Sequence, residues 1–449
     1  MDFTNIQEGT GMNKQNKSQN VQWKNTGKET LTLIIEGALV GGLAGITAIF
    51  YRFCLLWAET GLFRILEFIQ GNLPAIILWF LALIVMGCLV ARVVCLEPMA
   101  ASSGIPQVTG EIRGIFDICW WRILLAKFAG GTISILGGLS LGRSGPSIQL
   151  GAMAAKGYTR ARNYDKKKEI GLLACGAGAG LAATFNAPLA GLMFVLEEIH
   201  HTFDRTMLAA GLTATISASY ISRIFFGQNA LFSFTASSLP LHYYGLLILF
   251  GILSGLAAVG YNTVLVRVQA LFRRINKIPK EIMMSVVFVI SGALGLVLPQ
   301  VLAGGNRILQ LLESGKPALF TLVLLLCVKF IFSVLSTSSG APGGIFFPLL
   351  VLGACTGALY GTIVIDFLPL PAELYPQFII LGIAGLFSGV VRTPLTAILL
   401  ITELTGTVHS MLELAIVCIL SYTVANLLGS KPVCASLLDH VLLQTEKKT

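Results

Sequence analysis

Charged side chains are scarce in this sequence, and their scarcity excludes a soluble globular protein. Asp, Glu, Lys and Arg make up 12% of the 449 residues, against about 25% in a soluble domain. Hydrophobic residues account for 55%, and the mean hydropathy is +0.80. We therefore predict an all-α protein that crosses the membrane many times, because a helix satisfies its own backbone groups in lipid.

Motifs of enzymatic and metal chemistry are also missing. The nine cysteines form no CxxC pair and are typical of small buried apolar residues. His200 and His201 are adjacent, so on a helix they point about 100° apart and cannot chelate one ion. The chain has neither a Gly-rich phosphate loop with a following Lys-Ser/Thr nor a G-x-S-x-G elbow. We expect no enzymatic activity, no metal site and no cofactor.

Long apolar runs recur along the chain. Several approach the ~20 residues that a helix needs to span a bilayer, and others are shorter and adjoin Gly or Pro. The runs are Leu31–Phe53, Leu73–Val94, Ile123–Leu139, Gly171–Val195, Met207–Phe226, Tyr243–Val266, Ile282–Leu302, Leu319–Leu335, Leu349–Ile365, Phe378–Val391 and Leu412–Leu428.

The net charge of +9 follows the predicted topology rather than a nucleic-acid site. Basic residues gather before the first run, in one central loop and at the end of the chain, which makes both termini and that loop cytoplasmic by the positive-inside rule. These residues are Lys14, Lys17, Lys24, Lys28, Arg267, Arg273, Arg274, Lys277, Lys280, Lys447 and Lys448. We expect a multi-pass protein of the cell (inner or plasma) membrane that binds no nucleic acid.

The two halves of the chain resemble each other. Gly180–Ile199 and Gly385–Leu404 share a Gly-Leu start, a Pro-Leu step, an apolar stretch and a Glu. Transporters and channels use such duplications, often inverted, with the substrate site at the repeat interface. The matched positions are Pro188 with Pro394, Glu197 with Glu403, and Pro146 with Pro348.

Three breaks in the apolar sequence predict helix N-termini inside the membrane. They are "SSGIPQ" (Ser102–Gln107), "GRSGPS" (Gly142–Ser147) and "GAPGGIFFP" (Gly340–Pro348). Gly permits the bend, and Pro suits the first helical turn. Each N-terminus presents unpaired N–H groups and about half a positive charge. Hydroxyls and the basic Arg143 and Lys127 flank the breaks, so their convergence predicts an anion site.

These segments resemble the signatures of the CLC chloride channel and transporter family, usually GSGIP, GREGP and GxFxP. "AKFAGG" and "NAPLAGLMFVLEE" fit the same family. The resemblance covers nearly the whole chain from about residue 30 and points to the short prokaryotic type. It implies the CLC fold, with two inverted repeats, re-entrant and broken helices, and a homodimer in the lipid bilayer with one anion pathway per subunit.

The resemblance also implies a domain organisation. Expected are a polar cytoplasmic N-terminal tail, a transmembrane domain of two repeat halves, and a short cytoplasmic C-terminal tail without CBS domains. The corresponding ranges are 1–29, then 30–430 with halves of about 30–227 and 240–428, then 431–449.

By the family pattern, the Ser103 hydroxyl and the N–H groups of Ile345 and Phe346 hold the central chloride, while the segment from Ser144 lines the outer path. A serine at position 103, rather than the residues used by nitrate- or fluoride-selective relatives, favours chloride, and the expected partners are chloride and other small anions. The implied anion-binding residues are Ser103, Gly104, Ser144, Gly145, Ile345, Phe346 and Cys434, with Arg143, Lys127 and Glu198 in electrostatic or gating roles.

Two departures from the family pattern bear on mechanism. Ser144 stands where the family has a proton-carrying external gating glutamate, and Cys434 stands where it has an inner-gate tyrosine. Serine cannot titrate, and a thiol is smaller than a phenol. Glu198 matches the family's internal proton-relay glutamate. From Ser144 we predict chloride-selective transport without proton coupling, either as a channel or as a uniporter.

Two alternatives remain open. In one, the protein is a Cl⁻/H⁺ antiporter in which Glu111 or Glu197 substitutes for the missing glutamate. In the other, it is a non-conducting sensor that keeps the fold, against which the intact "SSGIP" and "GGIFFP" segments argue. A cation or amino-acid transporter would need buried carboxylates in mid-span, and the sequence has almost none.

Overall fold

The computed structural model is helical throughout its described part, which comprises residues 27–200, 205–228, 232, 234, 239–275, 278–368 and 370–446. Residues 1–26 of the predicted N-terminal tail lie outside this part. The α-helices are α1 (Gly27–Ile69), α2 (Leu73–Leu96), α3 (Ile105–Ile112), α4 (Trp120–Leu136), α5 (Ser144–Ala161), α6 (Lys166–Phe185), α7 (Pro188–Phe194), α8 (Arg205–Phe226), α9 (Tyr244–Arg274), α10 (Lys280–Val297), α11 (Asn306–Glu313), α12 (Leu319–Ser338), α13 (Phe346–Phe367), α14 (Tyr375–Val391), α15 (Pro394–Thr405), α16 (Met411–Leu427) and α17 (Val433–Glu446).

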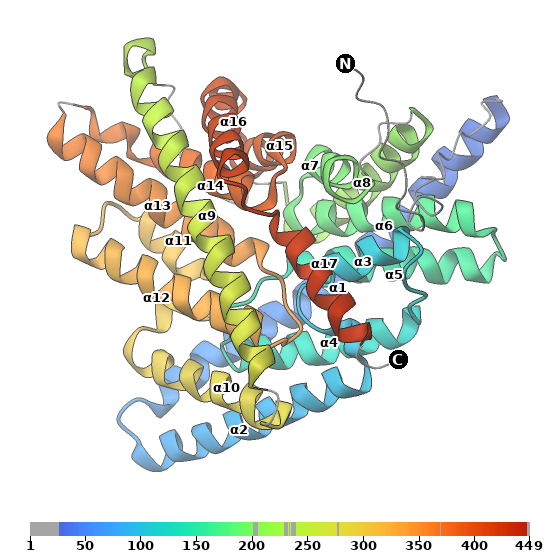
Figure 1. Ribbon diagram of the computed structural model, residues 1–449, viewed down its shortest axis with the longest axis horizontal. Coiled ribbons are helices and arrows are strands. Elements are labelled where there is room, and N and C mark those ends of the chain that lie inside the picture. The colour runs from blue at the N-terminus through green and yellow to red at the C-terminus, as the bar shows by residue number, and fades with distance from the viewer. Residues whose placement is uncertain are drawn as a thin grey trace, which may run out of the picture.

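The two halves of the chain have matching helices, and they lie side by side (Figure 1). The blue-to-green helices occupy the right and the lower edge of the view, and most yellow-to-red helices occupy the left, while α10 lies at the lower edge and α17 crosses the centre. The order α3 to α8 repeats as α11 to α16, with similar lengths for the short helices α3 and α11. In the first half α1 packs on α8 and α6, and in the second half α9 packs on α16 and α14.

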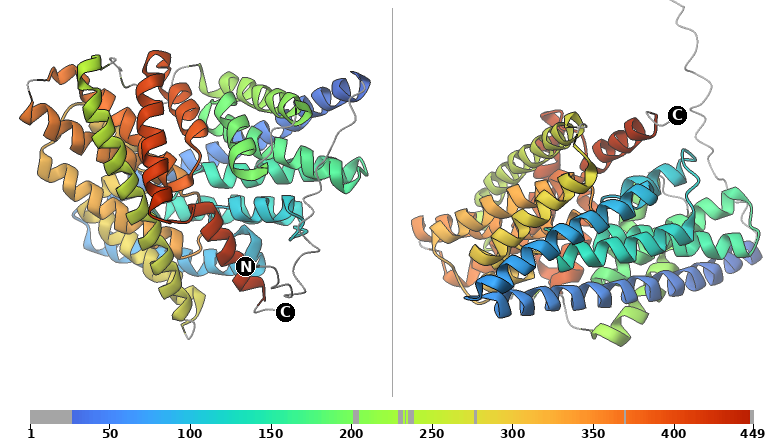
Figure 2. Two further views of the ribbon diagram at one scale, coloured as in Figure 1. Left: turned by 45° about the horizontal axis from the view of Figure 1, so that its top comes forward. Right: turned by 90° about the horizontal axis from the view of Figure 1, so that it is seen from below.

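Eight described helices are long and apolar enough to cross a membrane, so the chain is a multi-pass membrane protein. The first of them departs from the sequence prediction, because α1 continues well past Phe53 to Ile69. Figure 2 shows α1 in dark blue, running along one side of the molecule. The run predicted for Gly171–Val195 is divided at Asn186, whose left-handed backbone (φ 60°) ends α6 before Pro188 starts α7.

Glycines let the central helices approach closely in both halves. A Cβ added to Gly151 of α5 would lie 2.3 Å from the Gly176 carbonyl oxygen of α6, and one added to Gly382 of α14 would lie 2.4 Å from the Gly353 oxygen of α13. Small residues hold membrane helices together in this way, because lipid offers no hydrophobic driving force between helices. The two tight pairs, α5 with α6 and α13 with α14, fix the positions from which α5 and α13 begin.

Candidate functional site

Three loops meet where α3, α5 and α13 begin. The Ser102 N–H donates to the Gly340 carbonyl at 3.1 Å, and the Gly343 N–H donates to the Ser102 carbonyl at 3.1 Å. Gly142 and Gly344 exchange two N–H···O bonds of 2.6 Å, which ties the loop before α5 to the loop before α13. The predicted breaks of both repeat halves are therefore joined through their backbones.

The first turn of α5 lies directly on the other two loops. A Cβ at Gly145 would meet the Ser103 carbonyl oxygen at 2.9 Å and the Gly344 Cα at 3.2 Å. Gly104 ends its loop with a left-handed backbone, φ +92°, and caps α3. The structure thus brings the α3 and α5 segments beside Ile345, the N-cap of α13. Their helix N-termini converge, as the sequence predicted, and form an electropositive environment.

Buried hydroxyls lie at this junction without protein partners. The Ser144 and Ser147 hydroxyls are buried and have no hydrogen-bond partner among the described residues. The Ser103 oxygen accepts a long bond of 3.4 Å from the Ile105 N–H, and a hydroxyl keeps a proton to donate. Buried polar groups normally have partners, so these donors suit an anion that occupies the junction. Binding of chloride by these residues stays a prediction.

Lys127 supports the junction from behind. Its side chain is fully buried on α4, and its ammonium donates to the carbonyls of Ala100 at 2.8 Å and Ser102 at 2.6 Å. It thereby fixes the loop that carries Ser103, and an electrostatic role for its charge in anion binding stays a prediction.

A matching lysine escaped the sequence analysis. Lys329 on α12 is also fully buried, and it donates to the carbonyls of Val301 at 2.8 Å and Ala303 at 2.9 Å before α11. The signal was present, because "AKF" around Lys127 and "VKF" around Lys329 are spaced like the other repeat pairs.

Cys434 and Glu198 meet at another part of the site. Glu198 lies on a π-helical turn, Val195–His200, that continues α7, and such turns often occur at functional positions. Its carboxylate and the Cys434 thiol share a hydrogen bond. Cys434 is buried and is the second residue of α17. The helix α17 packs against α3. The last helix therefore joins the retained glutamate to α3, the helix that follows the Ser103 loop.

Glu197, offered above as a substitute proton carrier, has another contact. Its carboxylate accepts the backbone N–H groups of Leu395 at 3.2 Å and Thr396 at 2.8 Å, which are the first turn of α15. Glu403 on α15 does the same for α7, accepting from Leu189 at 3.1 Å and Ala190 at 2.9 Å. The two glutamates cap each other's helices across the repeat interface.

Glu111, the other candidate, lies in an ion-pair cluster. Its carboxylate is 2.6 Å from the Lys156 ammonium and accepts the Ile118 N–H at 2.7 Å. Lys156 also contacts Asp117 at 2.7 Å, and this hydrogen bond holds the pKa of the exposed Asp117 carboxyl below its usual value. The cluster joins the ends of α3 and α5 and the loop between α3 and α4, so Glu111 serves their packing.

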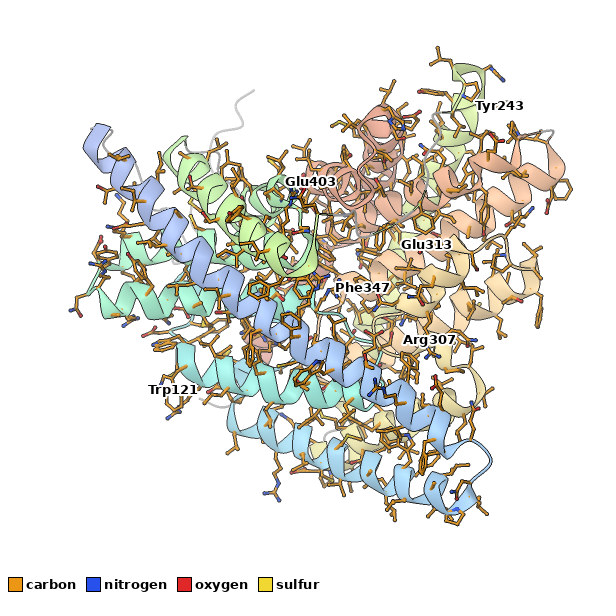
Figure 3. All side chains as sticks on the ribbon, turned by 180° about the vertical axis from the view of Figure 1, so that it is seen from behind. Trp121, Tyr243, Arg307, Glu313, Phe347 and Glu403 are labelled. Atoms are coloured by element: carbon orange, nitrogen blue, oxygen red, sulfur yellow. The ribbon has the colours of Figure 1, made fainter. Side chains whose placement is uncertain are left out.

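Arg143 faces a cavity that the sequence analysis did not foresee. Its guanidinium carbon lies 5.4 Å from the centre of the Phe347 ring, near the middle of the molecule in Figure 3. Glu59 and Asn306 also line this cavity, and the Asn306 amide donates to both Glu59 carboxylate oxygens at 3.0 Å. Glu59 was missed because the first span was predicted to end at Phe53.

Comparisons with known proteins match nearly the whole chain. Residues 81–426 match the family model described as voltage gated chloride channel. The chain is 33% identical to the H(+)/Cl(-) exchange transporter ClcA of Vibrio parahaemolyticus, covering 94% of this chain and 92% of that protein. It is 32% identical to the ClcA exchange transporter of Salmonella arizonae, covering 93% and 90%.

Solved structures agree in fold. The structure of a slow cyanobacterial Cl⁻/H⁺ antiporter matches with a TM-score of 0.87 and 28% identity, covering 92% of this chain and 99% of that one. A CLC-type fluoride/proton antiporter matches with a TM-score of 0.74 at 23% identity, covering 90% of this chain and 97% of that one.

Proposed function

The chain belongs to the voltage gated chloride channel family, and from that premise we propose that it exchanges chloride for protons across the membrane. Proteins of this family are transporters or channels, so the chain is not an enzyme. Chloride is its transported substrate, and transport requires no cofactor.

Proton coupling is a correction to the sequence analysis, which predicted uncoupled transport from Ser144 alone. That prediction is wrong, because the two relatives described above match the chain almost from end to end and are named H⁺/Cl⁻ exchange transporters. A structural neighbour at 28% identity is likewise described as a Cl⁻/H⁺ antiporter. The error lay in treating position 144 as the one place from which a carboxylate can reach the anion path.

The anion path is proposed to run through the junction of α3, α5 and α13. Ser103 and Ser144 supply hydroxyl donors, and the first N–H groups of the three helices supply a positive environment. Gly104 and Gly145 allow the backbones to approach closely, and Ile345 and Phe346 present the N–H groups of α13. Lys127 and Arg143 raise the potential without a direct role for Lys127 in contacting chloride, since its ammonium is bonded to two carbonyls.

Glu198 is proposed as the inner proton group. Its hydrogen bond to Cys434 puts a titratable carboxylate beside α17 and α3, where a proton from the cytoplasm can reach it. Cys434 takes the place of a bulkier gate, so the inner mouth of the anion path stays wide beside this carboxylate. Intramembrane carboxylates are costly and therefore mark ion and proton pathways.

The proposed setting is the bacterial plasma membrane, with both termini in the cytoplasm. Arg273 and Arg274 end α9, and this basic end is assigned to the cytoplasmic side by the positive-inside rule. We propose a homodimer in the bilayer in which each chain has its own anion path.

A flux assay tests the proposal. Purified protein is reconstituted in chloride-loaded vesicles, and chloride efflux and external pH are recorded together. We expect chloride efflux to drive proton uptake into the vesicles in a fixed ratio. An uncoupler should abolish the resulting pH change. Glu198→Gln should lower proton uptake at least tenfold, equivalent to about 1.4 kcal/mol, while the exposed Glu373→Gln leaves the ratio unchanged. Chloride efflux without proton uptake in the wild type would contradict proton coupling.

A further inference from the structure

A cavity with a partly polar lining lies beside the start of α5. Its volume is about 30 Å³, enough to hold a water molecule. Glu59 reaches it from α1, Arg143 from the residue before α5, and Asn306 from the first position of α11. Among the described residues that line this cavity, Glu59 is the one with an acidic side chain. A carboxylate, a guanidinium and an amide around one space inside a membrane protein are energetically costly, and such groups mark ion and proton pathways.

The cavity adjoins the proposed anion path. Gly142 and Arg143 line it, and Ser144 follows them directly as the first residue of α5. Phe347, another lining residue, is in the first turn of α13. A group in this cavity is therefore next to the position where the family places its outer carboxylate and where this chain has serine.

Repeat symmetry gives the cavity a known counterpart. Gly305 begins α11 with a left-handed backbone, φ +99°, as Gly104 begins α3 with φ +92°. Lys329 holds the loop before α11 by two carbonyls, as Lys127 holds the loop before α3. The starts of α11 and α5 therefore flank this cavity as the starts of α3 and α13 flank the chloride junction. By this symmetry the cavity is the counterpart of the proposed chloride junction, and Glu59 lines it.

The position of Glu59 along α1 indicates the outer side. The helical rise from Gly27 to Glu59 is roughly 48 Å, longer than the ~30 Å hydrocarbon core. With the N-terminus in the cytoplasm, as proposed above, the Glu59 end of α1 lies toward the outer face.

The charges around Glu59 make its protonation matter to chloride. The Glu59 carboxylate interacts electrostatically with Arg143 from the start of α5 and with Lys329 from α12. Arg52, on α1, repels Arg143, and Asn306 of α11 is neutral. The Arg143 Nε has no hydrogen-bond partner among the described residues. Arg143 can therefore attract either the ionised carboxylate or a chloride ion.

We infer that Glu59 is the outer proton acceptor of the exchange cycle, an inference that rests on the proposed proton coupling. When a carboxylate oxygen of Glu59 takes a proton from outside, Glu59 becomes neutral and no longer attracts the Arg143 guanidinium. Arg143 then stabilises a chloride ion beside Ser144. When the proton leaves toward Glu198, the ionised carboxylate competes with chloride for the same positive region. Proton and chloride movements are thereby linked although residue 144 cannot titrate.

Glu59→Gln tests the inference, since glutamine keeps an acceptor for Asn306 but cannot carry a proton. In the vesicle assay above, we expect chloride efflux to persist and the proton-to-chloride ratio to fall at least tenfold. Glu59→Asp should restore coupling, because it restores the carboxylate. Glu67→Gln is the matched control: Glu67 lies on the same helix, is exposed, and contacts Arg307 at 3.7 Å. Its ratio should equal that of the wild type.

The outcomes separate the two proposals. A wild type that moves no protons overturns proton coupling and this inference with it. A coupled wild type with a Glu59→Gln ratio within twofold of normal overturns the role of Glu59 alone. If Glu59→Gln transports nothing, Glu59→Asp decides: wild-type stoichiometry supports the inference, and active but uncoupled chloride efflux overturns it.

Discussion

At the scale of single residues, Ser144 has an unusual environment for a serine. Its hydroxyl is buried at the first position of α5 and has no described partner. Arg143 precedes it, and Gly145 behind it touches Ser103. A hydrogen-bond donor or an acceptor can occupy this position. A negatively charged side chain is stabilised most, because a helix N-terminus stabilises an anion by about 0.3–1 kcal/mol or more.

Ser144→Glu should therefore create a second, pH-dependent gate. A carboxylate at this N-terminus competes with chloride when it is ionised and releases the site when it is protonated. We expect chloride efflux to fall several-fold near neutral pH and to recover in acid. The measurement is efflux from vesicles across a pH series.

Ser314→Glu, at the exposed end of α11, is the control. It should follow the wild-type pH profile. A Ser144→Glu protein as fast as the wild type at every pH would mean that residue 144 does not line the anion path.

Residue-scale prediction from the sequence was accurate where local chemistry is distinctive. Gly and Pro patterns located the starts of α3, α5 and α13 to within a residue or two, because these residues restrict backbone conformation directly. Glu59 could not be found in this way. The functional role that we infer for Glu59 depends on Arg143 and Asn306, which are distant along the chain and approach Glu59 only in the folded protein.

At the scale of elements, the reciprocal caps join residues that lie 198 to 214 positions apart in the chain. Glu197 belongs to the continuation of α7 but completes α15, and Glu403 belongs to α15 but completes α7. The sequence matched these glutamates as repeat partners, yet it gave no sign that they bond across the interface. Their pairing requires the relative orientation of the two halves, which periodicity does not encode.

Glu403→Ala should destabilise the protein without changing its transport stoichiometry. It leaves two N–H groups of α7 without their acceptor, and loss of an N-terminal cap costs about 0.5–2 kcal/mol. Thermal unfolding in detergent measures the effect, with the exposed Glu373→Ala as a control that should unfold like the wild type.

Glu197→Ala should lower stability by a similar amount, because it removes the equivalent cap from α15. Unequal effects of more than about 2 kcal/mol would show that the two caps are not equivalent in solution.

At the scale of the whole molecule, much apolar surface faces outward, including Ile216, Tyr220 and Ile224 at successive turns of α8. Lipid and a second chain both cover such surface. We expect a dimer in detergent, with a protein mass twice the 48.0 kDa of one chain, measured by light scattering after gel filtration. A single-chain mass at micromolar concentration would contradict the homodimer.

The class of fold was predictable from the whole sequence because hydropathy and the internal repeat are properties of the entire chain. Helix ends were less predictable: α1 extends past its apolar run, since packing on α4 and α2 supports its more polar end. Proton coupling was mispredicted for the same reason that Glu59 was missed. The surroundings of Glu59, from which we infer the coupling, depend on how distant segments are placed around the start of α5.

The reciprocal caps also govern how the protein can be made. During synthesis the first half leaves the ribosome before residue 403 exists, so the start of α7 enters the membrane with N–H groups that have no acceptor yet. The Glu197 carboxylate likewise has no N–H donors from α15 until that helix has been synthesised. Each half therefore lacks one helix cap until α15 (Pro394–Thr405), near the end of the 449-residue chain, has been synthesised, and both caps can then form together.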